Sequence, residues 1–344
     1  MREMGARLGQ FCYDQYDGSR KAFPSRAALL AGDQEVSVKV VYCFDRKFSP
    51  YAAVSTYSLL QSSLSEVLVY WCVPQDEIPH IEPLVAIANK SGKGHIRIVG
   101  VTDHPFASWK LSNHLSYASY LRLLIPDLIP EERVIYLDSD TLILGDLTPL
   151  TTVDLGPAVI GGVMDLDVGQ SSGVPRAHDD PYVNAGVMVM KLGDLRRDHL
   201  LAAASEIYRK FEHQIAFQDQ CVINKFAEGR KILFDPRWNR QIRSNMLDVA
   251  QSQDVTLPAN TSILHFIGQI KPWQKRCNPV IANFWWDYAA LLNIEGLVPQ
   301  DIASVEEALD LAKSYDLLGL FKEASDLKTD IINAMFAHYE KRIS

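Results

Sequence analysis

The sequence predicts an α/β protein with a mostly parallel central sheet and helices on both of its faces. From residue 36 onward, apolar β-branched runs alternate with helical segments, which is the rhythm of parallel strands joined by right-handed crossovers. The 344 residues are 47% hydrophobic, enough to bury one large domain, with or without an appendage. Ligands of such sheets bind beyond the carboxyl ends of the strands, so polar residues at strand ends are the first candidates for function.

The first part of the chain alternates strand and helix signals. Three runs rich in β-branched and aromatic residues predict buried strands: 36–44, 67–73 and 96–101. Two segments with apolar residues at helical spacing predict the connecting helices: 51–63, opened by Pro50, and 81–88. Asp45 directly follows the first strand and therefore lies at a carboxyl end.

The middle of the chain continues the alternation. A strand over 133–137 runs straight into Asp138, and further strands are predicted at 158–163, 185–190 and 262–266. Helices are predicted at 115–124, closed by Pro126, and at 198–211 and 219–226.

The two ends of the chain differ from this pattern. Residues 1–35 show no sustained period and are interpreted as an extension, which leaves 36–296 as the main domain. From residue 297 we expect a small helical appendage, because Ser304 and Glu307 form a capping box. An apolar stripe marks its final helix: Leu327, Ile331, Met335 and Tyr339. Packing on the main domain is its expected role, with docking to a partner or a membrane as the alternative.

Charge and cysteine usage exclude several classes of protein. The net charge of −8 and the lack of a long basic run argue against nucleic-acid binding. The 5 cysteines are odd in number and include no CxxC pair, so neither a disulfide framework nor a cysteine zinc site is expected. No apolar run approaches the ~18 residues of a membrane span, and the N-terminus lacks the apolar core of a signal peptide. We expect a cytoplasmic protein that meets its acceptor there or at the inner face of the membrane; the oligomeric state is not predicted.

Asp138 and Asp140 are the first residues that indicate chemistry. Both carboxylates can reach into one crevice from the end of a strand, and hard divalent ions prefer carboxylate and phosphate oxygens. The pattern alone is weak, since the chain contains a second D-x-D at 165–167. The apolar strand that ends on Asp138 favours the first pair. An alternative interpretation is a haloacid-dehalogenase-like phosphatase with Asp138 as nucleophile, although about 100 residues of α/β pattern precede it.

The segment from His265 to Trp273, HFIGQIKPW, is more specific. It reads as a strand that leads into a glycine turn with a lysine beyond. His265 can ligate a metal through a neutral imidazole nitrogen, Gly268 allows the backbone to approach a phosphate, and Lys271 offers a compact positive charge. A buried histidine followed by a surface turn is the simpler alternative.

Several separated motifs together resemble glycosyltransferase family 8, which includes bacterial lipooligosaccharide galactosyltransferases, lipopolysaccharide glucosyltransferases and glycogenin. The resemblance covers about residues 36–285. Its motifs stand in family order: FD at 44–45, YLRL at 120–123, YLDSD at 136–140, VNAGV at 183–187, FQDQ at 217–220, WN at 238–239 and HFIGQIKPW at 265–273.

The resemblance implies a GT-A fold, a UDP-sugar donor and a bound manganese ion, Mn²⁺, or Mg²⁺ in its place. The implied metal ligands are Asp138, Asp140 and His265, while Gly268 and Lys271 are expected to face the diphosphate. The other residues carried over surround the donor: Asp45 at the base, Arg122 and Ser139 near the donor, and Asn184, Asp219 and Gln220 around the sugar ring. Lys47 and Ser119 depart from the family pattern, and His114 and Asp165 align with acceptor-side positions.

The expected reaction is transfer of a hexose, galactose or glucose, from UDP to a hydroxyl of a glycan acceptor, as in lipopolysaccharide biosynthesis. Negative charge grows on the leaving diphosphate, where a divalent metal and Lys271 would stabilise it. The resemblance implies retention of anomeric configuration. Gln220 and Asp219 are the candidate nucleophiles, but an amide is a poor one, and a front-face route is preferred. A nucleotide-sugar-binding protein without turnover remains a further alternative.

Overall fold

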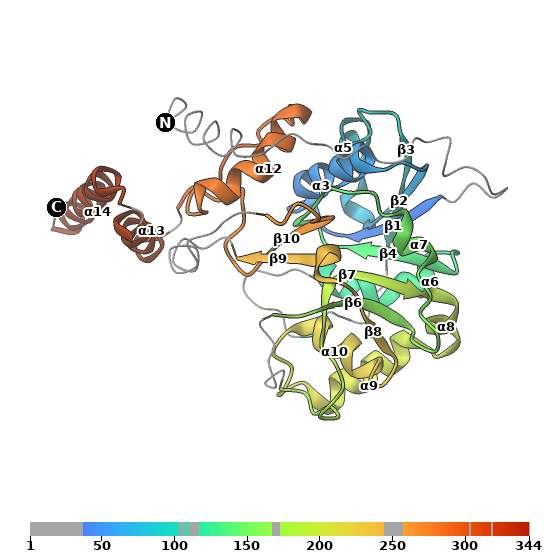
Figure 1. Ribbon diagram of the computed structural model, residues 1–344. Coiled ribbons are helices and arrows are strands. Elements are labelled where there is room, and N and C mark those ends of the chain that lie inside the picture. Colours follow the sequence, from blue (N-terminus) through green and yellow to red (C-terminus); the bar gives the residue numbers. More distant parts are fainter. Residues whose placement is uncertain are drawn as a thin grey trace. The chain divides into compact units, whose positions relative to one another are not determined.

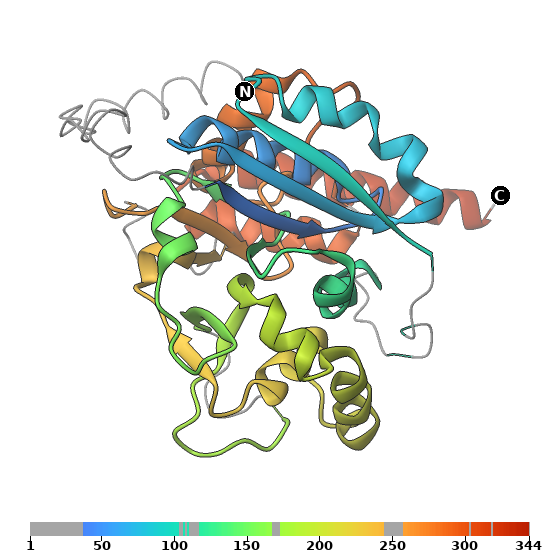
Figure 2. The ribbon, with the colours of Figure 1, turned by 90° about the vertical axis from the view of Figure 1, so that its right-hand side faces the viewer.

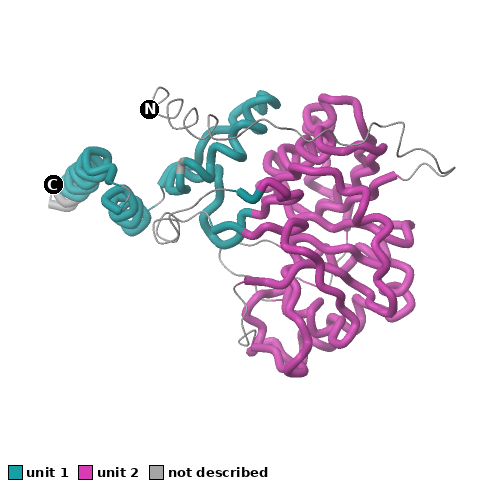
Figure 3. The backbone as a smooth tube through the Cα atoms, in the orientation of Figure 1, with its two compact units in different colours: residues 1–20, 242–258, 266–344 teal, residues 21–241, 259–265 magenta. Residues whose placement is uncertain are grey.

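The computed structural model describes residues 37–102, 106, 109, 117–166, 173–243, 257–302, 304–317 and 319–343. The chain divides into two compact units (Figure 3): unit 1 comprises residues 1–20, 242–258 and 266–344, and unit 2 comprises residues 21–241 and 259–265. The predicted extension at 1–35 lies outside the described residues, as do His114 and Asp167.

Unit 2 is built on a seven-stranded sheet of order β3-β2-β1-β4-β7-β6-β8 (Figure 1). Its strands are β1 Val38–Cys43, β2 Val67–Pro74, β3 Gly94–Val101, β4 Arg133–Leu137, β6 Ile160–Met164, β7 Val183–Lys191 and β8 Lys231–Leu233. Strands β1, β2, β3 and β4 are parallel neighbours, and β7 runs antiparallel to both β4 and β6. The prediction of a mostly parallel sheet is therefore confirmed, with one reversed strand in its middle.

Helices cover both faces of this sheet. On one face, helix α3 (Ser49–Ser62) packs on β1 and β2, where Trp71 Nε1 donates to Thr56 Oγ1 at 3.1 Å. The turned view shows β1, β2 and β3 side by side beneath the blue helix (Figure 2). Apolar residues of the other face share a core with the remaining helices: η3 Tyr117–Leu124, α6 Ile125–Leu128, α8 Leu192–Arg197, α9 Leu200–Phe211 and α10 Gln218–Phe226.

Some elements differ from the predictions for physical reasons. The segment predicted as a helix over 115–124 is a 3₁₀ helix where it is described, from Tyr117. Pro126 does not close it but opens α6, because a proline costs no hydrogen bond in the first turn of a helix. The predicted 81–88 helix is split into α4 (Ile78–Ile81) and α5 (Pro83–Ala88).

A second, three-stranded sheet of order β5-β10-β9 was not predicted. It contains β5 (Thr141–Ile143), β9 (Arg240–Arg243) and β10 (Ile263–Ile267), and only β10 was expected. Strands of three or four residues are too short to show a period, so they leave no clear trace in the sequence. The same holds for β8 and for the five-residue helix α7 (Thr148–Thr152).

Unit 1 carries three helices that follow the second sheet in sequence: α12 Pro279–Leu292, α13 Val305–Leu317 and α14 Phe321–Ile343. Ser304 Oγ accepts the backbone N–H of Glu307 at 3.1 Å, as the capping box predicts. The Glu307 carboxylate pairs with Arg276 at 3.0 Å. The predicted final helix is present as α14; of its stripe, Ile331 is buried and Met335 is 56% exposed, and the side chain of Tyr339 lies outside the described residues.

None of the helices among the described residues combines the length and apolarity that a membrane crossing requires.

Candidate metal centre

The two aspartates lie in the turn between β4 and β5. β4 ends at Leu137 and β5 begins at Thr141, so Asp138 and Asp140 stand at the carboxyl end of the fourth strand, as predicted. The turn is fixed from both sides: Asp138 N–H donates to Gly186 O at 2.8 Å, and Thr141 Oγ1 donates to Asp138 O at 2.8 Å. Its carboxylates therefore have a defined position before any ligand binds.

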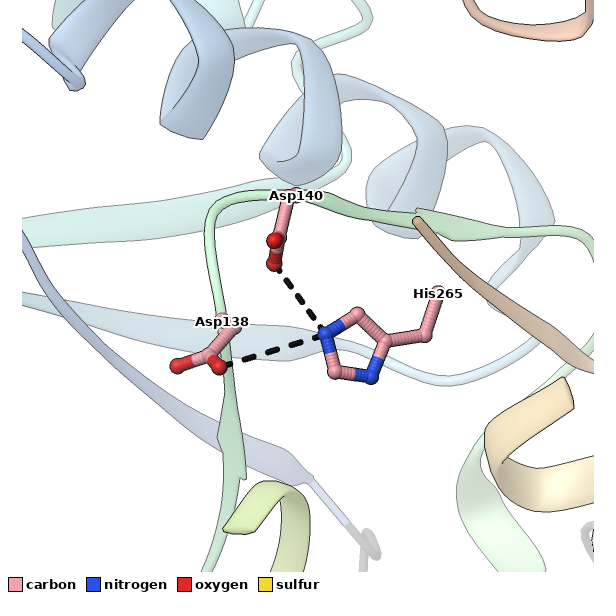
Figure 4. A group of neighbouring side chains, drawn as sticks. All are labelled: Asp138, Asp140 and His265. Atoms are coloured by element: carbon pink, nitrogen blue, oxygen red, sulfur yellow. Dashed lines mark ion pairs between the residues drawn. The ribbon is translucent and has the colours of Figure 1, made fainter. Parts of the chain in front are cut away.

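His265 reaches this turn because of strand pairing. β10 runs antiparallel to β5, and the register places His265 opposite Thr141. Figure 4 shows both aspartates pointing toward the imidazole, whose Nε2 lies 3.3 Å from Asp140 Oδ1 and 4.0 Å from Asp138 Oδ2. One donor atom from each of the three residues lies within 4.8 Å of the others. The structure thus brings together the three residues predicted as metal ligands.

Asp138 uses only one of its oxygens toward the histidine. Its Oδ1 accepts hydrogen bonds from Arg122 Nη2 at 2.8 Å and from Tyr136 OH at 2.7 Å. Arg122 also lies over the Tyr136 ring, 4.4 Å from its centroid. Since Oδ1 is occupied by these two donors, Oδ2 is the oxygen presented to His265.

Arg122 is buried between two carboxylates. Its Nε lies 2.9 Å from Asp219 Oδ2, and its Nη1 donates to Ala185 O at 2.7 Å. Although burial opposes it, Asp138 and Asp219 raise the pKa of Arg122 above its ordinary value. Burial raises the pKa of Asp219 from 3.8 to about 6, with Arg122 opposing the shift. Arg122 and Asp219 were predicted near the donor sugar; here they form one ion network with Asp138.

His265 is oriented by a series of neutral amides. Its Nδ1 lies 3.0 Å from Asn239 Oδ1, and Asn239 Nδ2 donates to Asn184 Oδ1 at 3.0 Å. Asn184 Nδ2 donates in turn to Asp165 Oδ2 at 2.8 Å, and Gln220 Nε2 donates to the same oxygen at 3.1 Å. Gln220 Oε1 accepts Ala185 N–H at 2.9 Å, so both ends of this amide are engaged.

Gly186 packs tightly against the cluster, and the sequence motifs assigned it no role. A Cβ built there would lie 2.2 Å from His265 Cε1 and 2.8 Å from Asp138 Oδ2. Only a residue without a side chain leaves this space between the histidine and the aspartate open. The available signal was a glycine inside a strand that is otherwise apolar, which marks a close approach to a ligand or to backbone.

The other predicted residues occupy separate places. Asp45 follows β1, the parallel neighbour of β4, and its Oδ1 accepts Phe48 N–H at 3.0 Å. Ser139 is 7% exposed, and its Oγ has no hydrogen-bond partner among the residues that the structure describes. Gly268 has a φ of +82°, which explains the glycine. Lys271 Nζ donates to Phe266 O at 2.7 Å within unit 1.

The donor set fits a hard divalent cation. Two atoms that ligate one Mg²⁺ at about 2.1 Å can lie at most about 4.2 Å apart; the two separations from His265 Nε2, 3.3 and 4.0 Å, satisfy this limit, and all three donor atoms lie within 4.8 Å of one another. Two carboxylate oxygens and an imidazole nitrogen suit Mn²⁺ or Mg²⁺. The buried hydroxyl of Ser139 between the two aspartates adds a polar group whose partner would be a ligand.

Solved structures share this architecture. The galactosyltransferase LgtC, in complex with donor and acceptor sugar analogues, has a TM-score of 0.66 and 24% identity over 75% of this chain and 97% of its own. The glycosyltransferase GlyE of Streptococcus pneumoniae has a TM-score of 0.57 and 22% identity over 75% of this chain and 62% of its own. The fold is that of the GT-A glycosyltransferases.

The sequence comparison identifies the family. The model of "Glycosyl transferase family 8" matches residues 39–277, well over half of the chain, and the chain belongs to this family. The glycosyltransferase GlyF of Streptococcus pneumoniae is 25% identical over 255 residues, 72% of this chain and 62% of the relative. The lipopolysaccharide 1,2-glucosyltransferase of Escherichia coli is 28% identical over 169 residues, 46% of this chain and 50% of the relative.

Membership of this glycosyltransferase family makes the phosphatase interpretation of Asp138 wrong. The alignments span less than two thirds of the length of either relative.

Proposed function

We propose that the protein is a retaining hexosyltransferase that moves galactose or glucose from UDP to a hydroxyl of a glycan such as a lipopolysaccharide. The observation that carries the proposal is the cluster of Asp138, Asp140 and His265, assembled from the β4–β5 turn and β10. Family membership and the names of the two relatives, a lipopolysaccharide glucosyltransferase and a galactosyltransferase, support the substrate class.

These three residues would hold one divalent cation, with Asp138 binding through Oδ2. When bound, the cation neutralises charge that develops on the leaving diphosphate. Arg122 keeps the Asp138 carboxylate in place through its other oxygen, 2.8 Å away. The buried Ser139 hydroxyl would donate to the donor substrate. Lys271 is proposed to face the diphosphate as a compact positive charge.

A front-face reaction suits the residues proposed around the sugar. Both ends of the Gln220 amide are engaged, by Ala185 N–H and by Asp165, and an amide is a weak nucleophile. The Asp219 carboxylate pairs with Arg122 at 2.9 Å, which lowers its reactivity. We therefore propose that the acceptor hydroxyl attacks from the side of the departing phosphate. A trapped glycosyl adduct on Asp219 or Gln220 would contradict this route.

A screen of UDP-sugars with Mn²⁺, scored as slow donor hydrolysis, tests the function. Asp140→Ala and His265→Ala should each reduce hydrolysis at least about 100-fold, because the metal carries the charge stabilisation. The matched controls are Asp154→Ala and His95→Ala; both residues are exposed and lie outside the cluster. Full hydrolysis in both site variants, or in excess EDTA, would refute the metal role. Binding of a UDP-sugar with neither hydrolysis nor transfer would favour a binding protein without turnover.

A further inference from the structure

The hydrogen bonds behind His265 have a direction that the backbone imposes. Asn184 Oδ1 accepts the N–H of Gly186 at 3.1 Å. A backbone N–H can only donate, so the atom of Asn184 that faces it must be the oxygen. This bond therefore fixes which end of the Asn184 amide is the oxygen and which is the nitrogen.

The neighbouring groups follow from this constraint. Since Asn184 presents its oxygen, the atom of Asn239 that lies 3.0 Å away must be the nitrogen, and Asn239 Oδ1 must face His265 Nδ1. An amide oxygen only accepts, so Nδ1 must carry the proton. In the neutral ring Nε2 is then the nitrogen with the lone pair, and it faces Asp138 and Asp140; a second proton would convert the ring to an imidazolium paired with these carboxylates.

The far end of the series is consistent with the same direction. Asn184 Nδ2 and Gln220 Nε2 both donate to Asp165 Oδ2, at 2.8 and 3.1 Å. Gln220 is itself oriented by a backbone N–H, that of Ala185. An ionised carboxylate accepts without donating, so Asp165 suits both amides. Asn184 is 6%, Asn239 1% and His265 4% exposed, so water is largely excluded from the bonds between these three residues, while Asp165 is half-buried.

We infer that Asp165, Asn184 and Asn239 form a directional hydrogen-bond relay that fixes His265 as the Nδ1–H tautomer and so prepares Nε2 as a metal ligand. The three are positioning residues, since they act through His265. The effect on metal binding rests on the proposed function. The tautomer does not, because it is a property of the metal-free protein. Hydrogen bonds of this kind behind a metal-binding histidine set its ring orientation and its basicity.

The first experiment is ¹⁵N NMR of the metal-free protein with labelled histidine. His265→Gln identifies the His265 signals among the 9 histidines. The relay predicts that Nδ1 is protonated at every pH, and that a rise in pH removes the proton of Nε2 and not that of Nδ1 in the wild-type protein. A neutral ring with the proton on Nε2, or rapid exchange between both tautomers, would overturn the inference, and it would do so in the wild-type protein itself.

The second experiment breaks the relay and measures binding of Mn²⁺ alone by electron paramagnetic resonance. Asn239→Leu should release the tautomer and weaken Mn²⁺ binding about 10- to 100-fold. Asn224→Leu is the matched control, because Asn224 is 2% exposed and its amide bonds only backbone groups, of Val183 and Gln220. It should leave both the tautomer and Mn²⁺ affinity unchanged.

Two further variants separate the outcomes. Asn239→Asp keeps an acceptor against Nδ1 and should retain the Nδ1–H signal; its loss would contradict the relay, as would an unchanged tautomer in Asn239→Leu. Asp165→Ala should weaken Mn²⁺ binding less than Asn239→Leu, because it lies two hydrogen bonds further away. A wild-type protein with the predicted tautomer that binds no Mn²⁺ would refute the proposed metal function and leave the relay intact.

Discussion

The β4–β5 turn and the middle of β10 both present residues to one cluster, but different interactions hold these residues in place. At the turn, Asp138 is held by a buried cation, Arg122, and by the hydroxyl of Tyr136. At β10, His265 is held by the neutral amides of Asn239 and Asn184. Charge supplies strength, since a buried ion pair is costly to break. The amides fix the donor and the acceptor of each hydrogen bond, since their nitrogen only donates and their oxygen only accepts.

Removing the cation should have the largest effect. Arg122→Ala leaves the buried Asp219 carboxylate and the 26% exposed Asp138 carboxylate without their partner. It should cost about 3–5 kcal/mol of unfolding free energy, measured by denaturant titration. Arg197→Ala is the control, because Arg197 is 70% exposed in its pair with Asp194, and should cost at most about 1 kcal/mol. Similar losses in both variants would mean that charge does not hold the turn.

Filling the space between His265 and Asp138 should have the second-largest effect. Gly186→Ala places a methyl group 2.2 Å from His265 Cε1, and the ring or the strand must move. A shift of about 1 Å at a reacting site costs about 100-fold in rate. We therefore expect donor hydrolysis with Mn²⁺ to fall by about this factor. Gly193→Ala is the control, since its Cβ meets only the carboxylate of Glu132, which is 83% exposed and can move away. Wild-type activity in Gly186→Ala would show that the site tolerates a methyl group between His265 and Asp138.

The buried Asp219 gives the turn a pH dependence that the neutral amides do not. Its pKa is raised from 3.8 to about 6 by burial, so between these values the folded protein binds a proton that the unfolded chain has released. Stability from this group is therefore present at low pH and falls as pH rises, by about 2 kcal/mol between pH 4 and pH 6.

Unfolding titrations at several pH values test this expectation. Asp219→Asn should remove that part of the slope relative to the wild-type protein. An unchanged slope would assign the pH dependence to other groups.

The smallest expected effect concerns the phenol on Asp138. Tyr136→Phe removes one donor to Oδ1 and should weaken Mn²⁺ binding about 10-fold, with a loss of about 1 kcal/mol in stability. Tyr70→Phe is the control, because its hydroxyl donates to Glu131 Oε1 at 2.8 Å and not to a residue of the ligand turn. This control should lose a similar amount of unfolding free energy and keep its Mn²⁺ affinity. Equal Mn²⁺ affinity in both variants would show that Tyr136 does not support the metal site.

The same comparison shows how much could be predicted from the sequence. Asp138 was found because an apolar strand ends directly on it, a local signal. His265 was found through a motif rather than through its neighbours: its position depends on the pairing of β10 with β5, a three-residue strand that shows no period. Asn239 and Gly186 lay inside matched motifs without an assigned role, since their function depends on contacts with residues distant in sequence.

The sheet was predicted well where strands are long and β-branched, and less well at its edges. β8 has three residues, and the antiparallel direction of β7 follows from its pairing, which a sequence period does not report. α12 had a readable signal that was missed: the side chain of Asn278 accepts Val280 N–H at 2.9 Å, and Pro279 occupies the first turn.

The connection from β6 to β7 starts and ends in the relay. Asp165 follows β6, Asn184 is the second residue of β7, and the two side chains are joined at 2.8 Å while Asp165 N–H donates to Tyr182 O at 2.9 Å. These two hydrogen bonds therefore join the two ends of the connection. Because the entropy of closing a loop grows slowly with its length, a change in the number of residues between Asp165 and Tyr182 should cost little while these two bonds keep Asn184 in place.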